Sequence, residues 1–496
     1  MGIDEQLFVA CKDGKVDQVK QLLNDPTINL SYENSNNHQT SFWIACENGH
    51  IEVVKLLLND GRIDGDINKV NEYDNYEGEC DIQRAMNGAT PFFIACENGH
   101  IEVVKLLLND SRVDINKPNK DGQTPFYIVC QRGHIEIVEL LLKDNRVDVN
   151  QPDGNDGLIR ETPFYSACGW GKTEVVKLLL NDQRVDINKA SDGVTPLYIS
   201  CYYGYFEIVK LLLNDQRVDI NKASNNGRTP FCTACSCGKT EIVKLLLNDS
   251  RVDINKANEN EATPFWKACQ IGHTEIVKLL LNDERIGDDI NKTTRTDTAF
   301  YSACYFIKTE VVKLLLNDER VDVNKTNNWS QTPFFIACEN GRIEIVKLLI
   351  NNNKTDLNKA SFDGTTPLLI ASEKGYIEII LHLLASTKGV TLNDRDLINV
   401  ERIKETAKKQ IMKSEDEFQL RFKNCENIVE LLKSFKRNPN ETRFKLRLQL
   451  GFTGKHFFLK KIISISLFQF FMDIEAASVF ATIVLLSDNY LNFKKE

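Results

Sequence analysis

The chain has 496 residues and a net charge of −9, with 42% hydrophobic and 26% charged residues. These fractions are ordinary for folded soluble protein and exclude a largely disordered chain, while the acidic balance argues against sequence-independent binding to nucleic acid. The first twelve residues include Asp4 and Glu5 and have no continuous apolar run. We therefore expect no signal peptide, reduced cysteines and a cytoplasmic location.

A sequence unit repeats along residues 1–385. Its copies read Thr-Pro-Phe, then Ala-Cys, then a glycine, then Glu-x-Val-Lys-Leu-Leu-Leu-Asn-Asp, and most lie 33 to 35 residues apart. A fixed period of this length is typical of a solenoid, in which each unit is too small to bury its own apolar face and stacks on its neighbours. We expect about eleven units. A shortened first unit around Cys11 is followed by units whose opening threonines are Thr40, Thr90, Thr124, Thr162, Thr195, Thr229, Thr263, Thr298, Thr332 and Thr366.

Residues 90–123 show the local structure expected of one unit. Thr90 is a good N-cap, and Pro91 suits the first position of a helix, where its missing amide would be unpaired anyway. The short helix that follows should end near Gly99, because glycine readily takes the left-handed conformation that closes a helix. A second helix should start at Ile101, followed by an extended segment and a polar turn. Each unit is thus predicted to be a helix, a turn, a second helix and a projecting hairpin.

In these motifs the chain resembles ankyrin-repeat proteins, over about 385 of its 496 residues. The resemblance implies an all-α repeat solenoid of stacked helix-turn-helix-hairpin units, here with a short helical C-terminal tail. It also implies that protein partners bind the concave face, which includes the two residues before each turn glycine. The family's usual histidine, two residues after the proline, is here mostly an aromatic residue.

Two irregular units interrupt the pattern. An insertion near residues 61–89 contains an acidic stretch at 72–81, which we interpret as a solvated hairpin extension. In the unit at 298–331, Ala299 replaces the proline and Ile307 replaces the turn glycine. Because a β-branched residue resists positive φ, we expect a turn of different shape there and a bend in the array.

The segment after the second helix holds one residue more than the usual ankyrin pattern. It commonly reads Asn-Asp-x-Arg-Val-Asp-Ile-Asn-Lys, and we infer a local bulge there. Its arginines should form a polar ladder along the array: Arg112, Arg146, Arg184, Arg217, Arg251 and Arg320.

The pattern decays toward the C-terminus. Residues 386–437 are expected to form a degenerate helical capping unit, with helices at 401–412 and 425–435. Residues 438–496 are basic and then hydrophobic: 443–450 fits either a strand or a basic amphipathic helix. The apolar runs 462–472 and 476–486 are each shorter than the ~20 residues needed to cross a bilayer. A packed helical pair is the default, a membrane-facing hairpin is the alternative, and translated intron sequence at 455–472 is a third explanation.

The sequence offers little support for catalysis or for a metal site. Cys232 and Cys237 flank Cys235, and His273 lies about one unit away. However, Cys235 is the regular repeat cysteine, where a small buried hydrophobic side chain is wanted, and one short helix does not supply four tetrahedral zinc ligands. Four histidines that follow the turn glycine should share a role at the start of a helix: His50, His100, His134 and His273. No catalytic triad or phosphate loop stands out, so we expect no catalytic residue, cofactor or metal.

The best functional prediction is an intracellular, monomeric protein-interaction scaffold that binds protein partners. At the positions before the turn glycine, both ends of the array are polar, while the middle is aromatic and apolar: Trp170, Tyr202, Tyr203, Ile271, Tyr305 and Phe306. Such a cluster has the composition of a binding hot spot; alternatively, these side chains pack on adjacent hairpins and stiffen the array. The competing functions are a membrane-tethered adaptor anchored by residues 443–486 and an enzyme with a catalytic part in residues 386–496.

Overall fold

The chain folds into helices joined by loops. The computed structural model describes residues 2–35, 38–72, 87–154, 160–392, 397–398, 401–402 and 416–450. Over these ranges the loops contain three isolated β-bridges and no strand. The all-α repeat class expected from the sequence is confirmed.

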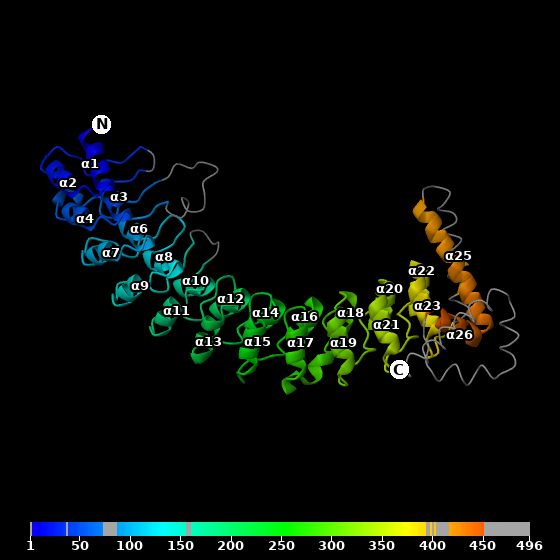
Figure 1. The fold of residues 1–496 in the computed structure, drawn as a ribbon. Coiled ribbons are helices and arrows are strands. Elements are labelled where there is room, and N and C mark those ends of the chain that lie inside the picture. Colours follow the sequence, from blue (N-terminus) through cyan, green and yellow to red (C-terminus); the bar gives the residue numbers. More distant parts are fainter. Residues whose placement is uncertain are drawn as a thin grey trace, which may run out of the picture. The chain divides into compact units, whose positions relative to one another are not determined.

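Eleven pairs of short helices follow one another in the described residues (Figure 1). The first helices of the pairs are α1 (Ile3–Lys12), α3 (Ser41–Glu47), α6 (Pro91–Glu97), α8 (Pro125–Arg132), α10 (Pro163–Gly169), α12 (Pro196–Tyr203), α14 (Pro230–Ser236), α16 (Pro264–Ile271), α18 (Ala299–Tyr305), α20 (Pro333–Glu339) and α22 (Pro367–Lys374). The second helices are α2 (Val16–Leu23), α4 (Ile51–Leu58), α7 (Ile101–Leu108), α9 (Ile135–Leu142), α11 (Thr173–Leu180), α13 (Phe206–Asn214), α15 (Thr240–Leu247), α17 (Thr274–Leu281), α19 (Thr309–Asn317), α21 (Ile343–Asn351) and α23 (Ile377–Ala385). The loops add the 3-10 helices η1 (Gly61–Ile63) and η2 (Glu284–Asn291), and α25 (Asp416–Arg437) and α26 (Pro439–Gln449) follow the last pair.

The ends of the first helices are set by threonine and glycine, as the sequence predicted. Thr90 Oγ1 accepts a hydrogen bond from the Phe93 amide over 3.1 Å, and Pro91 occupies the first turn of α6. Gly99, with φ of 77°, turns the chain into α7. The same threonine cap opens every first helix from α3 to α22.

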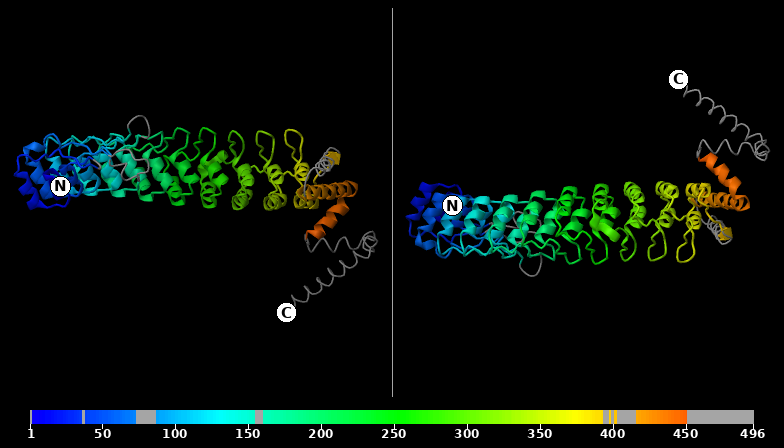
Figure 2. Two further views of the ribbon diagram at one scale, coloured as in Figure 1. Left: turned by 90° about the horizontal axis from the view of Figure 1, so that it is seen from above. Right: turned by 90° about the horizontal axis from the view of Figure 1, so that it is seen from below.

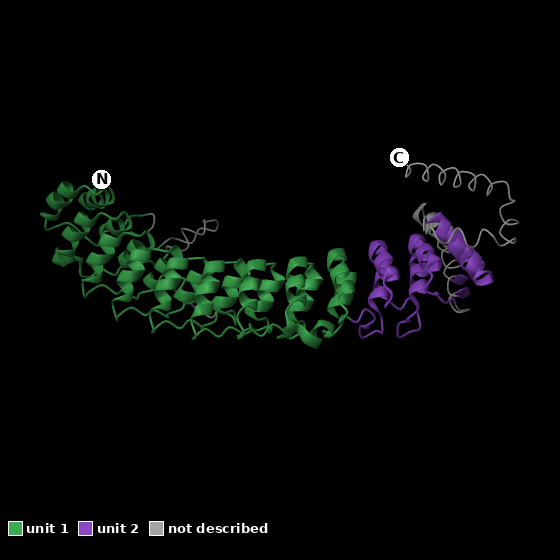
Figure 3. Ribbon diagram, turned by 60° about the horizontal axis from the view of Figure 1, so that its bottom comes forward, with its two compact units in different colours: residues 1–321 green, residues 322–496 purple. Residues whose placement is uncertain are grey.

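The helix pairs form two compact units, Met1–Val321 and Asp322–Glu496 (Figure 3). In the first unit, the first helices from α1 to α18 stack on one another, and the second helices from α2 to α19 form a parallel row. Both views of Figure 2 show these pairs in chain order, from blue to green. In the second unit, α20 packs on α22 and α21 on α23, while α26 contacts α23 and α25.

Arginine side chains join each second helix from α2 to α17 to the loop of the next repeat. Arg251 Nη2 donates to Leu213 O, near the end of α13, over 2.6 Å and to Asp249 Oδ2 over 2.6 Å. The Arg251 amide also donates to Asp249 Oδ1, so the extra residue of the loop forms a tight turn. The loop expected to bulge thus takes the form of this turn. The predicted ladder is present and includes two further arginines, Arg62 and Arg285.

Asparagine side chains form a second ladder. Asn221 Nδ2 donates to Arg251 O over 2.7 Å, and Asn221 Oδ1 accepts from the Asp253 amide over 2.9 Å. One asparagine thus satisfies two backbone groups of the following repeat. The same pair of bonds is made by Asn68, Asn116, Asn150 and Asn188.

The histidines after the turn glycine also join adjacent repeats. His100 Nε2 lies 2.8 Å from Glu47 O, and its ring covers the turn glycine of the preceding repeat. A Cβ atom placed on Gly49 would lie 2.5 Å from His100 Nδ1. The histidine stands at the start of its helix, as predicted, and its ring reaches back to the neighbouring repeat instead of capping that helix. His50, His134 and His273 make the equivalent bond.

The turn at Ile307 corrects another prediction. Ile307 adopts a φ of 60°, in the left-handed region, despite its branched Cβ. The Lys308 amide donates to Ala303 O over 2.9 Å, and the equivalent bond across Gly171 is also 2.9 Å. The turn thus keeps the common shape, and the reason for expecting a bend disappears. The surrounding hydrogen bonds and stacked helices impose a conformation that isoleucine alone would disfavour.

The C-terminal described residues form helices. Residues 443–450 were compatible with a strand or a helix, and 443–449 belong to α26. Leu446 is buried, the Arg443 guanidinium lies 5.5 Å from the centroid of the Phe435 ring, and Arg447 Nη1 donates to Ala385 O over 3.4 Å. The expected helix at 425–435 lies within α25. Predictions for residues 73–81, 403–412, 455–472, 462–472 and 476–486 concern segments outside the described residues.

Candidate functional site

Six apolar side chains occupy equivalent positions of different repeats in the compact unit Met1–Val321. They lie in the last turn of a first helix or directly after it, just before a turn residue of positive φ. The helices α10, α12, α14, α16 and α18 stack in order (Figure 1). Equivalent positions on them therefore follow one another along one side of the stack. We call this set the aromatic surface: Trp170, Tyr202, Tyr203, Ile271, Tyr305 and Phe306.

The aromatic surface is open to solvent. Trp170 is 60% exposed, Tyr203 51% and Phe306 44%. The rings form edge-to-face pairs: Tyr202 and Tyr203 have centroids 5.1 Å apart, and Tyr305 and Phe306 4.9 Å apart. Edge-to-face contacts of this kind favour particular ring orientations by about 0.5–1.5 kcal/mol.

Two neighbouring side chains extend this surface and were missed in the sequence analysis. Tyr205 lies 5.8 Å from Tyr203 between ring centroids, and Ile307 is 49% exposed beside Phe306. Ile307 was noticed only as a substitution of the turn glycine. Its apolar character, next to an aromatic pair, was the available signal.

Near the N-terminus, the equivalent positions are engaged within the array. The side chain of Glu97 is buried, and its Oε1 accepts a hydrogen bond from Arg132 Nη2 over 2.6 Å. Burial raises the pKa of Glu97, and the charge of Arg132 opposes that shift. Asn98 Nδ2 donates to Glu47 O over 3.0 Å. These polar residues therefore link repeats, whereas the aromatic surface leaves much of its apolar area uncovered.

A family model of ankyrin repeats (3 copies) matches residues 7–80, 63–153, 153–224, 214–294, 250–327 and 300–396. The chain belongs to the ankyrin-repeat family. Ankyrin repeats are generally protein–protein interaction modules, and proteins built from them are typically non-enzymatic scaffolds. A search of curated proteins found no match.

The cysteines of the ankyrin repeats lie in the interior. Cys232 and Cys235 are buried and Cys237 is half-buried, all as free thiols. Burial raises the pKa of Cys232 to about 11, so this thiol stays protonated and weakly nucleophilic at neutral pH. His273 Nε2 is engaged with Ser236 O at 3.1 Å. Within the described ranges, no group of three or more His, Cys, Asp or Glu side chains could hold a metal ion.

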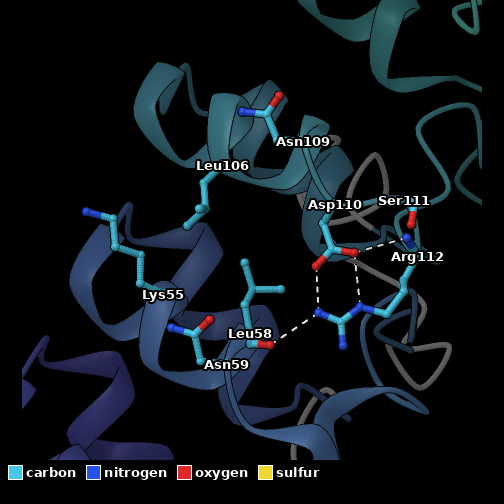
Figure 4. Close-up of a pocket in the computed structure, with 8 residues that line it drawn as sticks. All are labelled: Lys55, Leu58, Asn59, Leu106, Asn109, Asp110, Ser111 and Arg112. Atoms are coloured by element: carbon cyan, nitrogen blue, oxygen red, sulfur yellow. Dashed lines mark hydrogen bonds and ion pairs between the residues drawn. The ribbon is translucent and has the colours of Figure 1, made fainter.

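A shallow cavity of about 550 Å³ lies between the ends of α4 and α7 (Figure 4). Its two cations have partners: Lys55 Nζ lies 2.6 Å from Glu52 Oε1, and Arg112 is bonded to Asp110 and to Leu58 O. The cavity is thus part of the arginine ladder of the ankyrin array.

None of the helices in the described part of the chain is long and apolar enough to cross a membrane.

Proposed function

We propose that the chain is an intracellular, cytoplasmic scaffold or adaptor that binds protein partners through the aromatic surface on the concave face of its ankyrin array. The observation that supports this proposal is the exposure of large apolar side chains at equivalent positions of four first helices, α10, α12, α16 and α18. Large apolar side chains that gather in the open on one side of a soluble protein often mark a binding site.

The energetic argument rests on aromatic anchors. Tyr and Trp are enriched among residues whose truncation costs about 2 kcal/mol or more in binding, because they bury a large area with few rotatable bonds. Tyr203 and Phe306 each belong to an edge-to-face ring pair, and this favourable contact lowers the ordering cost of binding.

The test compares two exposed tryptophans of the full chain. Trp170→Ala combined with Tyr203→Ala should abolish capture of the main cellular partner, identified by proximity labelling, and leave the melting temperature nearly unchanged. Trp329→Ala is the matched control, because Trp329 is also 60% exposed but lies outside the aromatic surface. A large fall in melting temperature with capture intact would instead assign the aromatic surface to packing.

The proposal includes a monomeric chain that does not bind nucleic acid. The acidic net charge of −9 supports the second point, because phosphate backbones are bound through clustered cations. Sedimentation of the purified chain tests the first point: a dimer at micromolar concentration would contradict it.

A membrane-tethered adaptor is the second candidate. It is favoured by α26, which places three basic residues on one short helix directly before residues 451–496: Arg443, Lys445 and Arg447. Basic helices are attracted to anionic lipid surfaces. Carbonate-resistant pelleting of the full chain would support this candidate, and a wholly soluble pool would oppose it.

A further inference from the structure

A row of cations runs beside the aromatic surface. In the five repeats from α10 to α19, the residue that directly precedes the second helix alternates between a lysine and a ring-bearing residue. The lysines precede α11, α15 and α19, whereas Tyr205 and His273 precede α13 and α17. We call the three cations the lysine row: Lys172, Lys239 and Lys308.

Lys239 lies against the aromatic surface. Its Nζ donates a hydrogen bond to Tyr203 O over 3.1 Å, and its stem covers the turn glycine of the preceding repeat. A Cβ atom placed on Gly204 would lie 3.1 Å from Lys239 Cδ. The Lys239 ammonium is therefore held beside a residue of the aromatic surface that is itself 51% exposed.

The other two lysines reach back over the preceding repeat in the same way. A Cβ atom placed on Gly133 would lie 3.0 Å from Lys172 Cδ, and one placed on Gly272 would lie 2.7 Å from Lys308 Cδ. Gly272 directly follows Ile271 of the aromatic surface. The lysine row thus runs along the same ends of the first helices as the aromatic surface, at α8, α12 and α16.

The lysine row has no anionic partner among the residues that the structure describes. None of its three side chains forms an ion pair with a described carboxylate, and the two positions before each turn hold no acid from α10 to α18. The glutamate two residues after each lysine is already paired within its own helix: Glu174 with Lys177 at 3.7 Å, Glu241 with Lys244 at 2.7 Å and Glu310 with Lys313 at 2.6 Å. The row therefore places positive charge beside the aromatic surface, although the whole chain is acidic.

Both the charge and the spacing of the lysine row favour one kind of partner. The three side chains are half-buried and have lost part of their hydration, and a carboxylate placed beside them would form charge-assisted hydrogen bonds. Packed helices lie about 8–10 Å apart, so lysines two repeats apart are separated by about 16–20 Å along the stack. An extended peptide rises about 3.3 Å per residue and covers that distance in about five or six residues.

We infer that the lysine row binds Asp or Glu side chains of a partner segment that lies extended along the stack. Apolar residues between these acids contact the aromatic surface. The preferred partner is thus an acidic peptide with interspersed apolar residues. This inference rests on the proposed function, since it uses the same side of the stack, and it assigns the charge and the spacing of the partner, which the aromatic residues alone do not.

The test uses peptides selected from a random library displayed on phage against the full chain. The enriched peptides should carry Asp or Glu at intervals of about five or six residues, with aromatic or aliphatic residues between them. Their affinity, measured by fluorescence anisotropy, should fall about tenfold for the triple variant Lys172→Met, Lys239→Met and Lys308→Met, which keeps the stems over the turn glycines.

The matched control removes the same charge from the same three repeats. Its substitutions lie at exposed positions on α11, α15 and α19: Lys177→Met, Lys244→Met and Lys313→Met. This variant should leave the affinity of the selected peptides unchanged. An equal loss of affinity in both triple variants would overturn the inference, because it would show a dependence on net charge alone.

A double-mutant cycle separates this inference from the proposed function. Replacing the acidic residues of a peptide by their amides should weaken binding to the native chain and have little further effect on the variant that lacks the lysine row. An amide peptide that binds the native chain with unchanged affinity would overturn the inference, and this measurement does not depend on the folding of a variant. Peptides that lose binding with Trp170→Ala and Tyr203→Ala, yet show no coupling to the lysine row, would overturn the inference and leave the proposed function standing. Peptides unaffected by either set of substitutions would overturn both.

Discussion

The arginine ladder makes a quantitative prediction about what holds adjacent repeats together. In Arg251→Met, the side-chain length is kept, and the bonds to Leu213 O and to Asp249 are lost. A hydrogen bond from a charged group contributes about 1.5–3 kcal/mol, and a cation at a helix C-terminus adds about 0.3–1 kcal/mol. The side chain of Arg251 is 34% exposed, so solvent screening favours the low end. We expect a loss of ~1–2 kcal/mol.

A surface ion pair of similar length provides the control. Lys244 Nζ lies 2.7 Å from Glu241 Oε1, but both side chains belong to α15 and are well exposed. Lys244→Met should therefore leave stability almost unchanged, although it removes the same charge from the same repeat. The two variants thus distinguish a bond between repeats from a bond within one helix.

Urea unfolding of the full chain, followed by far-UV circular dichroism, measures the difference. Arg251→Met should lower the midpoint, Lys244→Met should not, and Arg251→Lys should lie between native and Arg251→Met, because an ammonium cannot reach both partners in the planar geometry of a guanidinium. Equal midpoints for Arg251→Met and Lys244→Met would refute the assignment of the ladder as a stabilising contact between repeats.

Three further predictions follow from the same contacts. Ile307→Gly should raise the free energy of unfolding by up to about 1 kcal/mol. Glycine relieves the strain of the left-handed backbone conformation, ~1–2 kcal/mol, and this exceeds the entropic cost of glycine, ~0.5–1 kcal/mol. Ile307→Ala keeps the strain and should not raise the melting temperature. Among the twelve cysteines whose side chains the structure describes, thiol labelling of the native chain should modify Cys237 first and Cys235 only on unfolding; fast labelling of Cys235 would contradict its burial. The arginine bonds lower the pKa of the ladder carboxyls, so the folded chain holds these protons less readily than the unfolded chain. The stabilisation by these carboxylates is complete above the usual aspartate pKa of about 4 and is lost as pH falls through the lowered pKa values. Stability measured against pH should therefore show that several protons are taken up on unfolding in acid. A stability that does not change below pH ~4 would oppose this role for Asp60, Asp110, Asp144, Asp182, Asp215, Asp249 and Asp283.

Local signals in the sequence predicted the helices well. Thr90, Pro91 and Gly99 act within a few residues of one another, so their consequences can be reasoned from the chain alone. Ile307 was mispredicted for the opposite reason: its backbone conformation is imposed by stacked helices that the local sequence does not encode. The predicted ladder lacked Arg62 and Arg285 because the residues that follow them differ from the common Arg-Val-Asp sequence. Both arginines nevertheless follow the same Asn-Asp-x sequence.

The positions of the aromatic surface could be predicted from the sequence, but the solvent exposure of its side chains could not. Equivalent positions of stacked helices share a side of the array, so Trp170 and Phe306 could be grouped from the repeat register. Whether each ring is covered depends on neighbours in the next repeat.

The bonds across each junction have a consequence for how such an array changes length. The Arg251 and Asn221 contacts recur at most junctions with the same partner positions, and neighbouring units share nearly identical helix sequences. Unequal recombination within these helices would therefore add or remove a whole repeat and regenerate both of its junctions. Where the event falls between α12 and α18, the separation of Tyr203 and Tyr305 would change by one repeat, so partner choice could diverge among descendants without a loss of foldability.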